Sequence, residues 1–479
     1  MAKRVKHSGR KGTFLILACL LVLLLATGTA AGVRGEEPLV RVALLQGVSD
    51  VSFRAGEGYT LVNTASGALI ADCAAGETWQ VRPRGDRLQV LRGGETLGTF
   101  SGPVVLRGAK GKPVTVAGAG GRDGEVSLDS GKTAVTGEGR LASLPPAGSY
   151  TVRSAAGMTT LEGGSAVQAT FALQVEGSYR RYRGDLVIKN TGGDTILAVN
   201  ELPVEQYLYS VVPSEMPYGW PAEALKAQAV AARTYALERV KARNRDYDVV
   251  PNTGSQVYHG AEWERPETTA AVEATRGVVL VHRGELIAAF FHSSSGGCTE
   301  DAEDVWTARL PYIRAQDDPY DRNPAHYGWQ VSYSADQLAA QMAAKGFIFG
   351  EPLPPEPSRG RIAQTVLDIE ELERTSTGRR VEKVRVTGLD PYGRPAQLEI
   401  YNADRVRIAF GLKSSYFTMM KKTDRSGRLL SITFTGNGWG HGLGMSQWGA
   451  RGMAEAGFSY GDILRHYYAD TEIVTNYAY

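Results

Sequence analysis

The chain has 479 residues, enough for two or three domains around a large core. Its charge is nearly balanced, with 53 Lys and Arg against 51 Asp and Glu. This balance, together with the lack of basic patches interleaved with aromatic residues, argues against a nucleic-acid partner.

Residues 1–35 have the pattern of an export signal. Five basic residues precede an apolar run from Phe14 to Ala26, and the small residues of TGTAAG follow. The apolar run is nearly long enough to span a bilayer if it is not cleaved. We therefore expect a signal peptide or an N-terminal membrane anchor. The remainder would lie outside the cytoplasm, either membrane-anchored or secreted.

Residues 36–176 are predicted to form a β-rich region. Short runs of β-branched residues, such as LVRVALL and SYTVRS, alternate with clusters of Gly, Asp and Pro. No cluster of acids with histidine, or of cysteines, is evident in this region. Two roles remain open: a separate wall-binding or positioning region, and a structural extension of the next domain.

A helical pattern dominates the start of the next region, residues 177–479. The segment PSEMPYGWPAEALKAQAVAARTYAL is rich in alanine after Pro221, which suits a first helical position. A helix that is apolar on nearly every side is usually buried. Later segments return to strands, and a glycine-rich segment leads into two short helices. The expected fold class is therefore mixed α+β, with the alanine-rich helix buried among strands.

Three polar residues, Lys226, Gln228 and Arg233, interrupt the alanine-rich helix. Lys226 and Arg233 are seven residues apart and therefore share a helix face, whereas Gln228 points elsewhere. A buried charge must be paired or face a wet cleft. The pattern alone leaves both interpretations open: salt bridges inside a large core, or a polar cleft built on this helix.

Glu215 stands just ahead of this helix. An acid there could simply gain from the positive end of the helix dipole. It could also be a general acid whose pKa is raised by an apolar wall. The nearby rings of Tyr218 and Trp220 favour the second interpretation, because aromatic side chains often form platforms for sugars.

These segments resemble the stage II sporulation protein D family, also called SpoIID/LytB. The resemblance starts at YLYSVVPSEMPYGWPAEALKAQAVAARTYAL and continues in the family's order through SQVYHG, FFHSSSGGCTEDAEDVW and GNGWGHGLGMSQWGARGMAEAGFSYGDILRHYY. It covers roughly residues 179–479. Members of this family act as lytic transglycosylases on peptidoglycan strands stripped of stem peptides. They cleave the β-1,4 bond between N-acetylmuramic acid and N-acetylglucosamine, whereas related members are described as amidase enhancers.

The resemblance implies a catalytic role for Glu215, which lies in the family's Glu-Met-Pro motif. This residue would act alone, first as acid and then as base, with no cofactor required. The implied partners are glycan strands and an amidase like stage II sporulation protein P. A non-catalytic amidase enhancer and a wall-binding sporulation scaffold are the alternatives. The residues expected to bind substrate are Lys226, Gln228, Arg233, Tyr218, Trp220, Gln256, His441, Ser446 and Gln447.

The loop GNGWGHGLGMSQWGA holds the last three of these residues. It lacks the endings of a phosphate loop and of a dinucleotide fingerprint. Alternating glycines allow the backbone to approach a ligand or another segment closely. In the family this loop helps to line the substrate groove, whereas tight loop packing is the alternative interpretation.

The segment HSSSGGCTEDAED spaces His292, Cys298 and Asp304 six residues apart. Imidazole, thiolate and carboxylate are all zinc ligands. Some family members carry a histidine and two cysteines at this spacing and bind zinc, whereas here the third position is an aspartate. The alternatives are a structural zinc site, a serine- and glycine-rich turn that contains a buried histidine and a small apolar cysteine, and a catalytic pair of His292 and Cys298, for which no third partner of clear type is present.

Overall fold

The computed structural model describes residues 37–108 and 170–477, except for residues 243–245, 307, 323 and 351–363. It also describes the backbone of several strands between residues 114 and 163. The expected signal or anchor, residues 1–35, lies outside these residues. Across the described residues, no helix is long and apolar enough to cross a membrane. The structure contains helices together with strands that form several sheets, which confirms the predicted α+β class with a β-rich region at the start.

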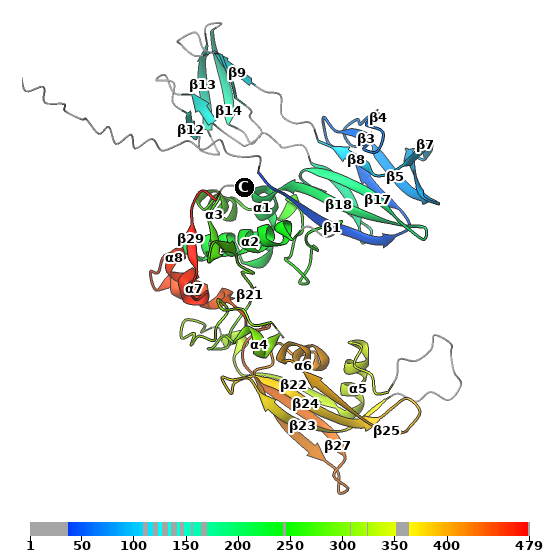
Figure 1. The fold of residues 1–479 in the computed structure, drawn as a ribbon, viewed down its shortest axis with the longest axis vertical. Helices are drawn as coiled ribbons and strands as arrows, with labels where there is room; N and C mark the ends of the chain where they lie inside the picture. Colours follow the sequence, from blue (N-terminus) through cyan, green and yellow to red (C-terminus); the bar gives the residue numbers. More distant parts are fainter. Residues whose placement is uncertain are drawn as a thin grey trace, which may run out of the picture.

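Two six-stranded antiparallel sheets pack face to face at the upper right of Figure 1. The first contains β1 (Leu39–Val48), β18 (Thr195–Pro203), β17 (Asp185–Gly192), β8 (Val104–Arg107), β3 (Thr60–Asn63) and β4 (Ala68–Asp72), in that order. The second contains β16 (Ser178–Tyr182), β15 (Phe171–Val175), β2 (Val51–Arg54), β5 (Thr78–Arg84), β6 (Arg87–Arg92) and β7 (Glu95–Ser101). Alternate residues such as Phe53, Trp79 and Val81 point into the shared core.

Short strand pairs occupy the stretch between β8 and β15, and only their backbone is described. Each pair is antiparallel and local in sequence. The pairs are β9 (Val114–Ala117) with β10 (Asp123–Val126), β11 (Thr133–Val135) with β12 (Leu141–Ser143), and β13 (Gly148–Ser154) with β14 (Gly157–Gly163).

The sandwich crosses the domain boundary that we expect from the sequence. That boundary, between residues 176 and 177, falls in the turn between β15 and β16, which pair with each other. β18 also pairs with β1, with Leu39 opposite Pro203. The sequence pattern could not reveal this boundary, because the strand partners are more than a hundred residues apart. The strands of the sandwich therefore continue to Pro203, and the first helix begins at Val204.

Three helices follow the sandwich: α1 (Val204–Glu215), α2 (Ala222–Lys241) and α3 (Pro266–Ala274). α2 is the alanine-rich helix and is buried along most of its length, as expected. Val204 and Tyr207 of α1, with Ala232 of α2, belong to the same hydrophobic core as sandwich residues such as Val40 and Leu202. Of the two roles considered for the β-rich region, this shared core supports a structural extension of the helical region.

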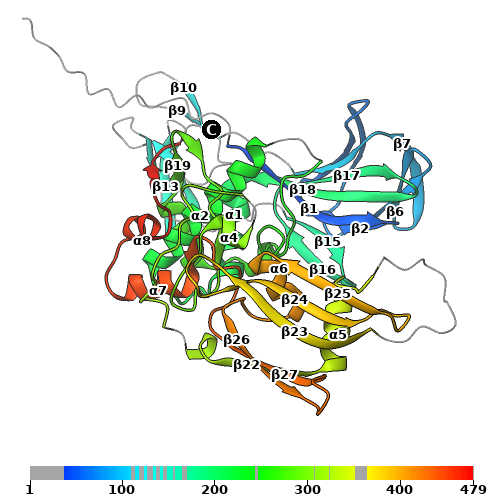
Figure 2. The same ribbon diagram turned by 60° about the horizontal axis from the view of Figure 1, so that its bottom comes forward.

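The C-terminal part of the chain returns to the helical layer. α7 (Gln447–Glu455) and α8 (Tyr460–Tyr467) both contact α2 (Figure 2). Short strands secure this arrangement: β28 (Met445–Ser446) pairs with β21 (Phe291–His292), and β19 (Val279–His282) pairs with β20 (Glu285–Leu286) and β29 (Glu472–Val474). Segments distant in sequence thus meet around α2.

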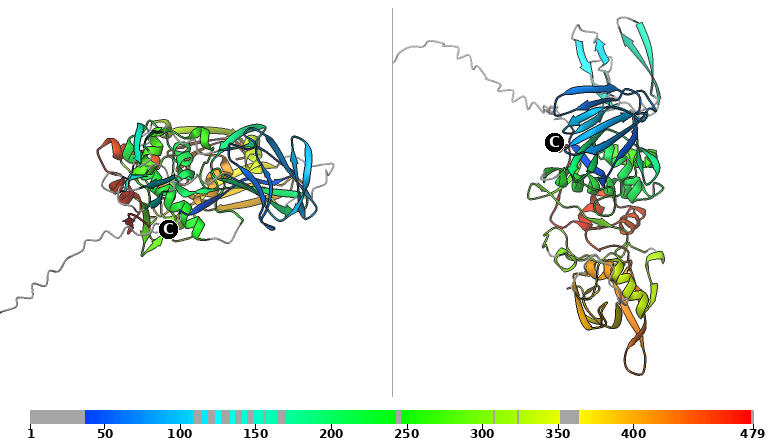
Figure 3. Two further views of the ribbon diagram at one scale, coloured as in Figure 1. Left: turned by 90° about the horizontal axis from the view of Figure 1, so that it is seen from above. Right: turned by 90° about the vertical axis from the view of Figure 1, so that its right-hand side faces the viewer.

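The segment between β21 and α7 contains a unit with its own hydrophobic core, which we call the inserted unit (residues 329–436). It lies at the end of the molecule opposite the sandwich, with the helices between them (Figures 1 and 3). Its strands are β22 (Trp329–Ser334), β27 (Leu429–Gly436), β26 (Phe417–Thr423), β23 (Thr365–Arg374), β24 (Val381–Leu389) and β25 (Pro395–Tyr401). Its helices are α5 (Ala335–Ala344) and α6 (Ala403–Phe410), and α4 (Ala302–Val305) precedes it.

Candidate active site

Glu215 is the last residue of α1, and α2 begins at Ala222. We expected Glu215 to stand just ahead of the alanine-rich helix. This expectation is corrected, because Glu215 ends α1 and a loop separates it from the start of α2. Met216 adopts an extended conformation, as residues before a proline such as Pro217 usually do, and this ends α1. At the C-terminal end of α1 the helix dipole does not stabilise a carboxylate.

The Glu215 carboxyl group is held by two hydrogen-bond donors. Its Oε1 accepts a hydrogen bond of 2.7 Å from the backbone N–H of Val257, and the side chain of Gln447 also donates to it. Glu215 remains partly exposed, although protein atoms surround most of the carboxyl group. Burial raises its pKa to about 7, and the two donors oppose that rise. The group can therefore both donate and accept a proton near neutral pH.

Gln447 joins three helices at this point. It is the first residue of α7, and its Nε2 lies 3.5 Å from Oε1 of Gln228, a fully buried residue of α2. Glu215 at the end of α1 completes the cluster. The structure thus brings Glu215, Gln228 and Gln447 together, with Gln228 in contact with Gln447. The predicted role of Gln228 and Gln447 in substrate binding stays a prediction.

Ser446 and Gln256 have positions that differ from the expected substrate groove. Both side chains are fully buried. The Ser446 hydroxyl accepts a hydrogen bond from the Gly449 N–H at the start of α7 and donates to Asp321. These contacts fix the start of α7, so the expectation that Ser446 faces substrate is corrected.

Gln256 supports the other donor to Glu215. Its Nε2 donates to the Ala232 carbonyl at 3.2 Å, and its Oε1 accepts a 3.0 Å hydrogen bond from the Tyr207 hydroxyl. These contacts tie the segment containing Val257 to α1 and α2. The prediction that Gln256 binds substrate is corrected, because its buried amide is already used to position the neighbouring backbone N–H.

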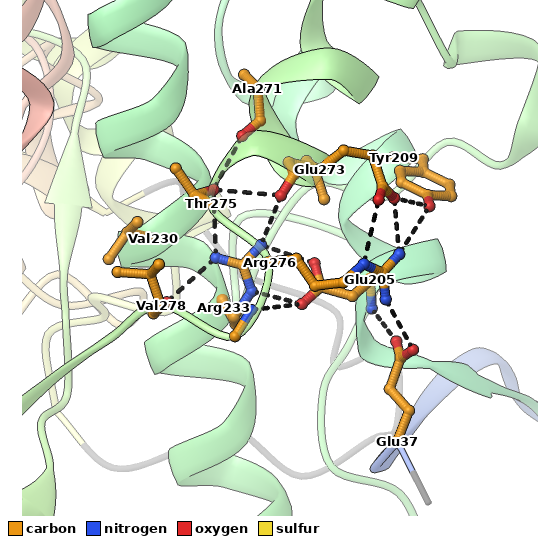
Figure 4. Close-up of polar contacts among 12 residues, drawn as sticks. Glu37, Glu205, Tyr209, Val230, Arg233, Ala271, Glu273, Thr275, Arg276 and Val278 are labelled. Carbon is orange, nitrogen blue, oxygen red and sulfur yellow. Dashed lines mark hydrogen bonds and ion pairs between the residues drawn. The ribbon is translucent and has the colours of Figure 1, made fainter. Parts of the chain in front are cut away.

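Arg233 does not face a cleft. Its fully buried guanidinium forms two hydrogen bonds with Glu205, of 2.8 and 2.6 Å, and a third with the Val278 carbonyl (Figure 4). The expectation that Arg233 binds substrate is therefore corrected in favour of the alternative, a salt bridge inside the core. The sequence could not identify this partner, which lies on a different helix.

Lys226 lies on the more exposed part of α2. Its ammonium pairs with Glu223 at 2.7 Å, and Glu223 accepts a hydrogen bond from the Tyr460 N–H. These contacts connect the start of α2 with the start of α8. Lys226 remains partly exposed, and its role in substrate binding stays a prediction.

His441 is part of the glycine-rich loop, and its ring lies in a cluster with the rings of Phe290, His292 and Trp306. Its Nδ1 accepts a hydrogen bond from the Leu443 N–H, and burial lowers its pKa to about 4. His441 is therefore neutral at pH 7. Its part in substrate binding stays a prediction.

The glycines of this loop serve close packing between segments. Gly444 has a φ of +64°, and a Cβ there would collide with the Phe290 carbonyl. Gly440 has a φ of +113°, and its Cβ would lie 2.8 Å from Cβ of His292. At these two positions the loop packs tightly against another protein segment, as the alternative interpretation of the glycines proposed.

The three expected zinc ligands make separate contacts. The His292 ring bonds the Leu443 carbonyl through Nδ1, the Cys298 thiol donates to the Thr299 carbonyl, and Asp304 accepts from the Ser376 N–H. Within the described ranges, no group of three His, Cys, Asp or Glu side chains is arranged to hold a metal ion. Burial also raises the pKa of Cys298 to about 11, which disfavours the thiolate. The residues present therefore do not fit a zinc site.

Tyr218 and Trp220, which follow Glu215 in the chain, each contact another side chain. Tyr218 is 53% exposed, and the Arg265 guanidinium lies 5.7 Å from its ring centroid. Trp220 contacts Trp448 edge to face, with ring centroids 4.8 Å apart. Sequence analysis did not select Trp448, although its place directly after Gln447 was a usable signal.

Comparison with known proteins identifies the class of this chain. A family model described as "Stage II sporulation protein" matches residues 192–282, which include α1, α2 and Glu215. A second model, described as a domain of unknown function (DUF8618), matches residues 308–444 and therefore the inserted unit.

Individual relatives agree with this assignment. The chain is 32% identical over 292 residues to stage II sporulation protein D of Bacillus amyloliquefaciens, which covers 58% of this chain and 75% of that protein. It is 34% identical over 290 residues to an uncharacterized protein of Brachyspira hyodysenteriae, covering 59% of this chain and 69% of that protein. The chain belongs to the stage II sporulation protein D family, as the sequence resemblance predicted.

A third relative is named for a different role. The amidase enhancer of Bacillus subtilis (strain 168) is 33% identical over 303 residues, which is 56% of this chain. The match spans only 40% of the length of that protein.

Proposed function

We propose that this protein is a lytic transglycosylase that cleaves the β-1,4 bond between N-acetylmuramic acid and N-acetylglucosamine in peptide-stripped glycan strands during sporulation. One observation carries the proposal: burial raises the pKa of the partly exposed Glu215 carboxyl group to about 7, beside the backbone N–H of Val257 and the side chain of Gln447. A general acid works best when its pKa lies near the working pH. Membership of the stage II sporulation protein D family supports a role in sporulation and the cell wall.

In the proposed reaction, Glu215 first acts as an acid. Its carboxyl proton moves to the glycosidic oxygen as the bond from that oxygen to C1 of the muramic residue breaks. The resulting carboxylate then takes the proton of the C6 hydroxyl of the same residue. The C6 oxygen bonds to C1 and closes a 1,6-anhydro ring, so no water is consumed and Glu215 regains its proton.

The chemistry fits a site with one carboxyl group. Hydrolytic glycosidases commonly use two carboxyl groups, about 5–9.5 Å apart. Burial raises the pKa of Glu215, and the hydrogen bonds from Val257 and Gln447 lower it. None of these influences comes from a second carboxylate. Glu205 is paired with Arg233, and Glu223 with Lys226. Both nearby acids therefore have other partners.

A second candidate function is the activation of a peptidoglycan amidase without glycan cleavage. The specific observation that favours it is the match to a relative named an amidase enhancer. The same fold would then only bind the wall or the amidase. In either case we propose that the protein acts outside the cytoplasm, which the export pattern of residues 1–35 supports.

The test compares wild-type protein with Glu215→Gln on purified peptide-free strands. We expect Glu215→Gln to lower the cleavage rate at least about 10²–10⁴-fold, the usual contribution of a general acid. Glu267→Gln, which changes an exposed acid of α3, is the matched control and should retain full activity. Full activity of Glu215→Gln would exclude the proposed role of this residue. Stimulation of an amidase by a wild-type protein that leaves the strands intact would favour the second candidate.

A further inference from the structure

A row of aromatic rings leads from the Glu215 site to the inserted unit. It starts with Trp220, continues through Trp448 and His326, and ends at Trp439. The successive ring centroids are 4.8, 6.0 and 5.1 Å apart. We call these four residues the tryptophan row. Its outer end is open, because Trp439 is 48% exposed.

A cation lies over each end of the tryptophan row, and the two cations differ in their partners. The Arg451 guanidinium lies 5.4 Å from the Trp220 ring centroid, but it pairs with Glu455 at 2.7 Å. The Lys413 ammonium lies 5.2 Å from the Trp439 ring centroid and donates only to the Ala325 carbonyl, at 3.3 Å. Among the described residues no carboxylate forms an ion pair with Lys413. Its charge is therefore available to a ligand.

Backbone contacts hold this outer end in place. The Gly440 N–H donates to the Lys413 carbonyl at 2.8 Å, and the Gly438 N–H donates to the His326 carbonyl at 2.7 Å. The backbone on both sides of Trp439 is therefore held against the segments that contain Lys413 and His326. Burial and the nearby charge of Lys413 lower the pKa of His326, so Lys413 supplies the positive charge at this end.

An exposed indole lies beside an ammonium that pairs with no carboxylate of the described residues, and this combination suits one kind of ligand. The flat apolar face of a pyranose ring can lie on the indole, and an ammonium binds a carboxylate through charge-assisted hydrogen bonds. A neutral sugar would use only the ring, and a simple anion only the ammonium. A sugar that carries a carboxylate uses both groups.

We propose that Trp439 and Lys413 form an outer subsite for a carboxylate-bearing sugar of the same strand that is cleaved at Glu215. The muramic acid residues of a peptide-free strand carry such a group on their lactyl side chain. This identification of the ligand rests on the proposed function. Lys413 lies between α6 and β26, so the inserted unit contributes specificity to the site while the helices contribute the acid.

The test measures strand binding in the Glu215→Gln background, where the strands stay intact. The probes are peptide-free strands, the same strands with their carboxylates amidated, and an uncharged N-acetylglucosamine hexamer. We expect Lys413→Gln to weaken binding of the untreated strands about fivefold, in the range of a partly exposed ion pair, and to leave the other two probes unaffected. Lys413→Arg should retain the binding, and Trp439→Ala should weaken binding of all three probes.

Lys422→Gln is the matched control, because this lysine also lies in the inserted unit, on β26, away from the tryptophan row. Each variant is first checked for an unchanged melting temperature. Equal binding of untreated strands by Lys413→Gln and its parent would overturn the proposal, as would an equal loss on amidated strands. Strand cleavage is measured separately. If the wild-type protein does not cleave but Lys413→Gln shows the selective loss, the outer subsite stands and the proposed function fails.

Discussion

Glu215 owes its chemical character to its surroundings. Burial disfavours the charged carboxylate, whereas the Val257 N–H and the Gln447 side chain favour it. The resulting pKa of about 7 is a balance between these contributions. The motif identified this residue and Gln447 was expected in the site, but the other donor could not be predicted, because it is a backbone N–H more than forty residues away.

Gln447 should set the pH range of the reaction. Because the first step needs the protonated carboxyl group, the rate should fall as the pH rises through about 7. Gln447→Leu removes a donor that lowers the pKa of Glu215, so the alkaline limb of the rate profile should move to higher pH. The measurement is kcat/KM against pH on peptide-free strands. An unchanged alkaline limb would show that Gln447 does not control this proton.

At the scale of the element, α2 combines a predictable property with one that depends on its partners. Its alanines and Pro221 were sufficient to predict a slim buried helix, because small side chains let neighbouring elements approach. The roles of its polar residues could not be predicted in the same way. Gln228 reaches the active site through Gln447, whereas Arg233 is bound to Glu205 in the core. Each role depends on contacts with other helices.

The Arg233–Glu205 pair should affect stability rather than chemistry. Arg233→Met leaves the Glu205 carboxylate buried without its cation, which should cost about 3–5 kcal/mol of unfolding free energy. The double variant Arg233→Met with Glu205→Leu should recover much of that loss, because no charge is then left buried. Denaturant unfolding measures both. If Arg233 instead bound substrate, the single variant would keep its stability and lose strand affinity.

For the whole molecule, the sandwich and the helices share one hydrophobic core. β1 and β2 pair with strands that follow residue 170, and the core is continuous from Val40 to α2. Sequence patterns identified the strands but not their partners, so the predicted boundary at residues 176 and 177 was misplaced. The separate hydrophobic core of the inserted unit was not predicted either, because the sequence pattern did not show which strands pack together.

Truncation tests this unity. A chain that begins at residue 177 lacks β1 and β2 and exposes the strands that they cover, so we expect no cooperative thermal unfolding. A chain that begins at residue 37 retains the whole sandwich and should unfold in a sharp transition. Circular dichroism during heating distinguishes the two. A stable, cooperative fragment from residue 177 would show that the β-rich region is a separate module.

The products formed from peptide-free strands test the central claim most directly. A chain of residues 37–479 is incubated with such strands at pH 7, and the new chain ends are identified by mass. A single acid that also serves as the base predicts 1,6-anhydromuramic ends, which are lighter by one water than reducing ends, and their loss in Glu215→Gln. New reducing ends would contradict the account, and so would strands that stay intact in the presence of folded protein.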